Sequence, residues 1–127
     1  MKYVVDSSGW LEFFADGPNA GFFEEPLAEA SCLIVPVITI YEVFKIVLRQ
    51  RGENAALQTV ALMKQGTVID VDENLALEAA KLSLEFKTPM ADSIILATAR
   101  IHQAELWTQD EDFESIPGVR YFPKRPN

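Results

Sequence analysis

Residues 2–9, Lys-Tyr-Val-Val-Asp-Ser-Ser-Gly, decide the architecture of this chain. The short apolar run at their start predicts a buried strand over residues 2–5. Asp6 ends that run, and the small polar residues behind it favour a turn or the cap of a helix over residues 10–15. The chain therefore opens with a strand that leads directly into a helix.

The same alternation of strands and helices continues to the end of the chain. It predicts right-handed crossovers and an α/β fold whose mainly parallel sheet of four to five strands is covered on both faces. In such sheets, functional groups gather beyond the carboxyl ends of the strands, near the point where the strand order reverses. The other expected strands are 33–36, 67–71, 105–107 and 119–122, and the other expected helices are 19–30 (interrupted near Pro26), 39–50, 53–65, 73–86 and 92–102.

The composition indicates one compact domain over residues 1–127, with an apolar fraction of 49% that is ordinary for a globular protein. Cys32 is the single cysteine, so we expect a buried thiol, no disulfide framework and a reducing compartment, the cytoplasm. His102 is the single histidine, which leaves little for a zinc cluster or a Ser-His-Asp triad. No signal-peptide core precedes Asp6, and the apolar region 33–41 is too short to span a bilayer. We expect no membrane association.

The charge balance opposes strong electrostatic binding of long nucleic acids. Eleven basic and nineteen acidic residues give a net charge of −8, whereas nucleic-acid binders usually carry a basic footprint. A nucleic-acid substrate would need a local basic strip. Candidate phosphate contacts are Lys45, Arg49 and Arg100, together with the small basic tail Lys124-Arg125. Solubilising or ion-paired roles are the alternative for each.

Acidic side chains follow the expected strands or lie on the helices beside them. Asp6 ends the first strand, Glu42 lies on the helix after the second, and Asp110 follows the fourth. Asp92 opens the helix before the fourth strand. Converging carboxylates without cysteine or histidine suit a hard divalent cation such as Mg²⁺ or Mn²⁺. This pattern indicates metal-assisted cleavage of a phosphodiester and therefore a small nuclease.

Each acid also has a purely structural explanation. Asp6 could cap the following helix, and Asp92 could be a first-turn acid favoured by the helix dipole. Glu42 could belong to a solvated polar stripe, and Asp110 and Asp112 to an acidic loop. Independent caps, however, have no reason to converge on one end of one sheet. Their joint placement favours the functional interpretation.

Four stretches of the chain carry a family resemblance that covers nearly its whole length. The set resembles the PIN-domain ribonucleases, and more narrowly the VapC-type toxins of bacterial and archaeal toxin–antitoxin pairs. Each motif alone is nonspecific, but their order and spacing together are distinctive. They are Val5-Asp6-Ser7-Ser8, Ile40-Tyr41-Glu42-Val43, Ala91-Asp92-Ser93-Ile94-Ile95-Leu96-Ala97-Thr98-Ala99 and Thr108-Gln109-Asp110-Glu111-Asp112-Phe113.

The resemblance implies a three-layer α/β/α domain that is usually dimeric. It also implies a metal-dependent endoribonuclease that uses Mg²⁺ or Mn²⁺ and leaves a 5′-phosphate and a 3′-hydroxyl. Its catalytic, metal-binding quartet would be Asp6, Glu42, Asp92 and Asp110, with Asp112 as a candidate fifth member or water-mediated ligand. We expect Asp6 and Asp92 to contribute most to a first metal position, which Asp110 completes. Glu42 would hold a second ion or orient the attacking water.

The resemblance extends to two supporting positions and one departure. Ser8 and Thr108 match polar positions that orient the carboxylates. The segment Lys87-Thr88-Pro89-Met90 replaces a commoner version that contains Gly or Ser. This departure concerns the shape of the loop before Asp92 and leaves the acid in place.

The first two expected helices are rich in aromatic residues. Core packing explains most of them, and some could line a groove for an amphipathic partner helix. The resemblance implies that the partner is an antitoxin, which would send a basic side chain into the acidic site and compete with metal. The apolar residues concerned are Trp10, Leu11, Phe13, Phe14, Phe22 and Phe23.

Three other functions remain to be distinguished. A phosphoacceptor receiver domain would need an acidic pair after the first strand, an acceptor such as Asp70 after the third, and a lysine after the fifth, which is not convincing here. A phosphatase with a DxD nucleophile is excluded because Ser8 stands where its second acid is needed. A non-catalytic or regulatory metal-binding interaction module is the remaining alternative, and the presence of all four acids argues against it.

Overall fold

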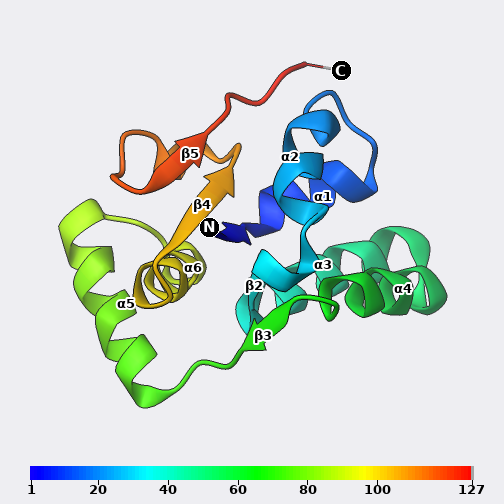
Figure 1. The fold of residues 1–127 in the computed structure, drawn as a ribbon. Coiled ribbons are helices and arrows are strands. Elements are labelled where there is room, and N and C mark those ends of the chain that lie inside the picture. The colour runs from blue at the N-terminus through cyan, green and yellow to red at the C-terminus, as the bar shows by residue number, and fades with distance from the viewer. Residues whose placement is uncertain (127) are drawn as a thin grey trace.

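A computed structural model describes residues 1–126, in which five strands alternate with six α-helices (Figure 1). The strands are β1 (Lys2–Val5), β2 (Ile34–Pro36), β3 (Thr67–Ile69), β4 (Ala104–Thr108) and β5 (Val119–Tyr121). The helices are α1 (Ser7–Phe14), α2 (Ala20–Leu27), α3 (Val37–Arg51), α4 (Glu53–Met63), α5 (Glu73–Phe86) and α6 (Met90–Ile101). Two short 3₁₀ turns, η1 (Ala30–Cys32) and η2 (Glu111–Phe113), complete the described part.

All paired strands run parallel, as predicted, but backbone hydrogen bonds divide them into two sheets. One sheet has three strands in the order β1-β4-β5, and the other contains β2 and β3. A single parallel bridge between Tyr3 and Leu33 joins β1 to the start of β2. The spatial order is therefore β3-β2-β1-β4-β5, and the undivided sheet of four to five strands that we predicted is split at this bridge.

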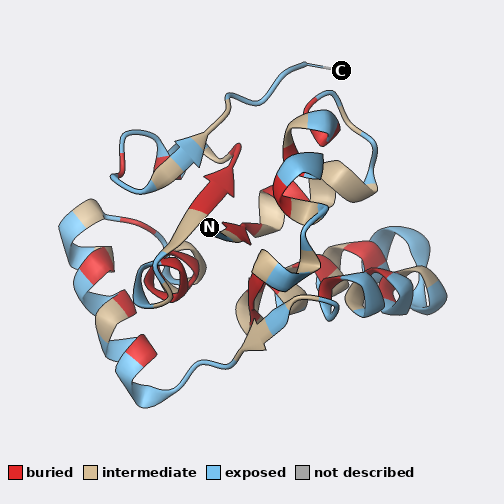
Figure 2. Cartoon of the chain, viewed as in Figure 1, coloured by how far each residue is buried: buried red, intermediate tan, exposed pale blue. Residues whose placement is uncertain are grey.

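Helices cover both faces of this layer of strands, which confirms the predicted three-layer α/β/α arrangement. Because successive side chains of a strand point to opposite faces, neighbouring residues enter different cores. One core lies against α5 and α6, and the other lies against α1 to α4 (Figure 2). The pairs that divide in this way are Val4 and Val5, Ile34 and Val35, and Leu106 and Trp107.

The strand order reverses between β1 and β4. The chain moves outward from β1 through β2 to β3 and then returns to the other side of β1 with β4. Val5 pairs with Trp107, and the Asp6 amide donates to the Trp107 carbonyl at 3.2 Å. The carboxyl ends of β1 and β4 are therefore neighbours at the position where open α/β sheets bind ligands.

This order also decides against the receiver domain. Receiver folds place their third strand beside the first, whereas β3 here lies at the edge of the layer. Asp70, which directly follows β3, is exposed and separated from β1 by β2. An acceptor at Asp70 would not face the acid that ends the first strand.

The helix boundaries differ from the predictions for local reasons. α1 begins at Ser7 rather than residue 10 because the Asp6 side chain accepts a hydrogen bond from the Gly9 amide at 2.9 Å. α2 is not interrupted at Pro26, which lies one residue before its end, where the proline removes a single backbone hydrogen bond. α6 begins at Met90, so Asp92 lies within its first turn and does not open it.

Cys32 lies in η1 and is half-buried, not buried as predicted. β2 begins only at Ile34, which leaves the cysteine outside the strand. Across residues 1–126, no helix combines the length and the apolar character needed to cross a bilayer.

Two helical glycines provide a matched test of this packing. In Gly9→Ala the new Cβ would lie 2.6 Å from Val5 Cγ1 and 2.7 Å from Phe23 Cε1, so we expect a loss of about 1–3 kcal/mol of stability. In Gly21→Ala the new methyl meets nothing within 4 Å, and the higher helix propensity of alanine should add about 0.5–1 kcal/mol. Urea midpoints at unchanged m-value measure both effects. Equal midpoints for the two variants would contradict the close packing at Gly9.

Candidate metal centre

Asp6 is the most enclosed acid of the site, with a relative exposure of 2%. Its carboxylate accepts hydrogen bonds from Ser8 Oγ at 2.8 Å, the Gly9 amide at 2.9 Å and Thr108 Oγ1 at 2.6 Å. Burial raises the pKa of Asp6 from 3.8 to about 6, against the lowering effect of these hydrogen bonds. The negative charge of Asp110 makes the smallest contribution to this net shift.

Thr108, the last residue of β4, connects two of the acids. Its hydroxyl donates to Asp6 and accepts a hydrogen bond from the Asp110 amide at 2.9 Å. The Thr108 side chain is fully buried, so water does not compete for these two hydrogen bonds. Thr108 and Ser8 thus both donate hydrogen bonds to the Asp6 carboxylate.

Asp92 is presented by a turn that hydroxyl groups hold in place. Lys87 ends α5 in a left-handed conformation with φ of 57°. The hydroxyls of Thr88 and Ser93 lie 2.6 Å apart, and Ser93 also donates to the Pro89 carbonyl at 2.8 Å. The segment 87–90 before Asp92 therefore forms a defined turn that leads into α6. Asp92 lies in the first turn of α6, where the helix dipole stabilises a negative charge.

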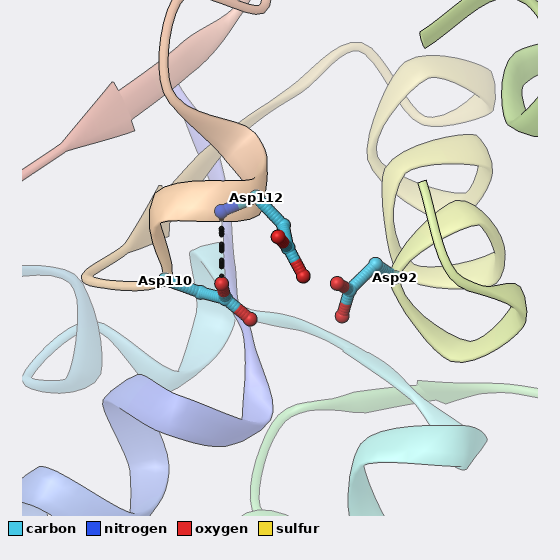
Figure 3. A group of neighbouring side chains, drawn as sticks. All are labelled: Asp92, Asp110 and Asp112. Carbon is cyan, nitrogen blue, oxygen red and sulfur yellow. Dashed lines mark hydrogen bonds between the residues drawn. The ribbon is translucent and has the colours of Figure 1, made fainter. Parts of the chain in front are cut away.

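Asp92, Asp110 and Asp112 form the tightest group of acids. Figure 3 shows Asp92 facing the other two across the gap between α6 and η2, and one oxygen from each of the three carboxylates lies within 4.8 Å of the others. The Asp112 amide donates to Asp110 Oδ1 at 2.9 Å and fixes their relation. The pKa of Asp92 is raised from 3.8 to about 7, first by desolvation and then by the negative charges of the neighbouring acids Asp110, Asp6, Asp112 and Glu42.

Glu42 completes the set from α3. It is half-buried, and one of its oxygens accepts a hydrogen bond from Ser7 Oγ at 2.5 Å. The structure therefore brings all five sequence-predicted acids to one edge of the strands. Asp6 lies outside the tightest group, with its oxygens occupied by hydroxyl and amide donors. The catalytic and metal-binding roles of the five acids remain a prediction.

The three basic candidates are not engaged with these acids. Arg100 stacks over the Phe86 ring at 5.2 Å and donates to the Pro117 carbonyl at 3.0 Å. Lys45 and Arg49 are exposed on α3, on the turns that follow Glu42. Within residues 1–126, none of the three makes a hydrogen bond or ion pair to an acid of the site. Their substrate contacts stay a prediction.

Sequence reasoning missed a buried amide network beside Asp110. Asn19 is fully buried, and its Nδ2 donates to Gln109 Oε1 at 2.9 Å. Gln109 Nε2 donates to Glu12 Oε1 at 3.3 Å, and the other oxygen of the same carboxylate accepts a hydrogen bond from the backbone N–H of Asn19 at 2.7 Å. Asn19 precedes a helix, so its only local signal is that of a cap, yet its side chain caps nothing. A contact across 90 residues leaves no local pattern.

The donor set fits a hard divalent cation. The close group consists of carboxylates alone, which is the preferred chemistry of Mg²⁺ and Mn²⁺. His102 caps α6 at the end opposite Asp92, where its ring nitrogen contacts the Thr98 carbonyl at 2.9 Å. Trp107 is buried in the core.

Comparison with known proteins decides the family. The family model described as "PIN domain" matches residues 3–119. The chain belongs to the PIN domain family. Ribonuclease VapC4 of Mycobacterium tuberculosis is 34% identical over an alignment of 93 residues, and the match covers 67% of this chain and 72% of the relative. The resemblance to PIN-domain ribonucleases and VapC-type toxins is thereby confirmed.

Solved structures show the same fold. This PIN domain is similar to a toxin–antitoxin complex from Klebsiella pneumoniae, with a TM-score of 0.80 and 27% identity over 94% of this chain and 96% of the other. It also resembles VapC20 of Mycobacterium tuberculosis, a sarcin-ricin loop cleaving toxin, with a TM-score of 0.72 and 18% identity over 91% and 95% of the chains. A DNA-bound VapBC from Salmonella typhimurium gives a TM-score of 0.74 and 18% identity over 97% and 98%.

The raised carboxylate pKa values predict how stability of the metal-free protein depends on pH. Because the folded-state pKa of Asp92 exceeds the unfolded value, the stability present below about pH 4 is lost as pH rises through about 7. Asp92→Asn should therefore raise stability at pH 8 by about 1–2 kcal/mol, after allowance for solvent screening at this half-buried group. The variant should have little effect at pH 4.

Urea unfolding in EDTA at the two pH values measures this difference. Asp16→Asn is the matched control, because Asp16 is an exposed acid with a left-handed backbone that asparagine tolerates. A stabilisation by Asp92→Asn that is the same at pH 4 and pH 8 would contradict the ionisation of a desolvated carboxylate among like charges as its cause.

Proposed function

We propose that this PIN domain is a divalent-metal-dependent endoribonuclease and the toxin of a type II toxin–antitoxin pair. The observation that carries the proposal is the convergence of Asp92, Asp110 and Asp112 within 4.8 Å. In residues 1–126 no salt bridge involves these carboxylates, so their repulsion is not relieved by a basic side chain. A cation is the natural counterpart of such a group. The ribonuclease VapC4 relative supports RNA as the substrate.

Each acid has a role that follows from its surroundings. Asp92, Asp110 and Asp112 would hold Mg²⁺ or Mn²⁺, which supplies Lewis-acid activation of water and offsets charge on the phosphate when bound. Asp6, whose carboxylate accepts hydrogen bonds from Thr108 and Ser8, would complete the coordination. Glu42, held by Ser7, would orient the attacking water or hold a second ion. The products expected for this chemistry in the family are a 5′-phosphate and a 3′-hydroxyl.

An antitoxin is the proposed protein partner, and this chain has a hollow suited to an apolar side chain. The hollow lies between α1, α3 and α4 and has a volume of about 230 Å³. Only part of the predicted aromatic groove contributes, since Trp10 and Phe23 are buried in the core. The Klebsiella toxin–antitoxin complex supports such a partner. The apolar residues that line the hollow are Leu11, Phe14, Ala15, Val47, Ala55 and Leu62.

We further propose a homodimer that acts in the cytoplasm. Leu77 and Leu84 on α5 and Met90 on α6 are 58%, 84% and 74% exposed, which provides apolar surface for a second copy. The family expectation of dimers supports this assembly. Two points support the cytoplasm: the proposed substrate is RNA, and the single cysteine cannot form a disulfide within the chain.

Cleavage of an RNA panel tests the enzymatic proposal. We expect purified protein to cut one or more structured or single-stranded RNAs with Mg²⁺ or Mn²⁺ and not with EDTA. Asp92→Asn removes one charge from the close group and should lower the rate at least about 100-fold. Asp16→Asn makes the same chemical change on the exposed surface and should retain the wild-type rate.

Cleavage that persists in EDTA would contradict metal dependence. Activity retained in Asp92→Asn would contradict the assigned site. If no RNA in the panel is cut, Mn²⁺ binding separates the alternatives: binding lost in Asp92→Asn supports the site with a narrower substrate, and no binding by the wild-type protein favours a non-catalytic interaction module.

A further inference from the structure

A second cavity adjoins the acidic site on the side of the C-terminal segment. It has a volume of about 510 Å³, within the range of about 300–1,000 Å³ found for ligand pockets. Asp110 and Ser8, which belong to the acidic site, form part of its wall. The rest of the wall comes from the two neighbours of Asp110 in the chain, from the end of β5 and from the residues after it. The lining residues are Ser8, Gln109, Asp110, Glu111, Tyr121, Pro123 and Lys124.

The segment after β5, residues 122–126, is fixed beside the site and does not extend freely into solvent. The Phe122 amide donates to the Thr108 carbonyl at 2.9 Å, and the Phe122 ring lies 4.5 Å from the Phe22 ring. The Arg125 guanidinium stacks over the Phe122 ring at 5.3 Å and donates to the Pro18 carbonyl at 2.9 Å. The path of this C-terminal segment is therefore set by contacts with β4 and with the loop before α2.

Asn19 holds the two residues that flank Lys124. Its Nδ2 donates to the Pro123 carbonyl at 3.0 Å, and its Oδ1 accepts from Arg125 Nε at 2.6 Å. The same Nδ2 donates to Gln109, the neighbour of Asp110 in the chain. One fully buried amide thus fixes both the backbone around Lys124 and the strand end that carries Asp110.

Lys124 has the charge that a phosphate needs at this position. It is the one cation among the described residues that line the cavity, whose wall also includes the acids Asp110 and Glu111. It is exposed and makes no ion pair within residues 1–126. The chain has a net charge of −8 and as a whole repels a phosphate backbone. A lysine beside the acidic site can attract a phosphate locally.

We propose that this cavity is a substrate subsite in which Lys124 contacts a phosphate adjacent to the scissile one, and that Asn19 is the positioning residue that holds Lys124 there. The inference deepens the proposed function and rests on RNA as the substrate. It assigns phosphate binding to the C-terminal segment, whereas Arg100 is occupied by Phe86 and Pro117.

RNA binding without cleavage tests the subsite. Every protein carries Asp92→Asn so that the RNA stays intact, and the probe is a short fluorescein-labelled single-stranded RNA with Mg²⁺. Lys124→Gln should raise Kd about three- to tenfold, and the slope of log Kd against log[KCl] should fall by about 0.7, the value for one phosphate contact on a single strand. Lys124→Arg should restore both quantities.

Lys64→Gln is the matched control, because Lys64 is exposed and precedes β3, at the end of the strands opposite the site. The subsite is wrong if Lys124→Gln changes Kd and the salt slope no more than Lys64→Gln does, or if the parent protein binds no RNA. Cleavage by the protein without Asp92→Asn is measured separately. A cutting enzyme with a silent Lys124 refutes the subsite alone. A Lys124 effect on RNA binding, in a protein that neither cuts RNA nor binds Mn²⁺, refutes the nuclease alone.

A double-mutant cycle tests the positioning role of Asn19. Asn19→Ala should raise Kd and lower the salt slope toward the values of Lys124→Gln, because the lysine loses its fixed position. When Lys124→Gln is already present, Asn19→Ala should add little. Additive effects, or a weaker affinity with an unchanged salt slope, would show that Asn19 serves stability only.

Discussion

The parallel pairing of β1 with β4 is the constraint on which the site depends. Val5 opposes Trp107, so both strands end at the same level and deliver Asp6 and Thr108 side by side. The Thr108 hydroxyl then joins the Asp6 carboxylate to the Asp110 amide, and η2 turns Asp112 back toward Asp110. Residues separated by about a hundred positions in the chain become one site because two strands share an edge.

The rest of the fold opposes the repulsion that this arrangement creates. Two apolar cores fix the strand layer from both faces, and the hydroxyl pair of Thr88 and Ser93 fixes the start of α6. Like charges held this close favour protonation, and burial has the same effect on a carboxylate. Burial is the largest cause of the raised pKa values of Asp6 and Asp92, about 6 and about 7, and neighbouring acids add to both. The site is thus prepared for a cation that removes the repulsion.

Features with a local or periodic signal could be predicted from the sequence. The alternation of strands and helices predicted a sheet covered by helices on both faces. The position of Asp6 directly after an apolar run predicted that it lies at the end of a strand. The start of α6 was predicted two residues too late. A hydrogen bond between the hydroxyls of Thr88 and Ser93 holds the turn before it, and the sequence carries no pattern that indicates this bond. The network around Asn19 was missed because its partners lie 90 to 106 residues away. The split of the sheet at Tyr3 depends on strand geometry, which side-chain patterns do not encode.

Proton release on metal binding tests most directly whether the fold forces these carboxylates together. Mn²⁺ titration by calorimetry, in buffers of different ionisation enthalpy, counts the protons displaced. With pKa values of about 6 for Asp6 and about 7 for Asp92, we expect roughly 1.4 protons released per protein at pH 6 and almost none at pH 8. Binding with no proton release at pH 6, or no binding at either pH, would contradict the account.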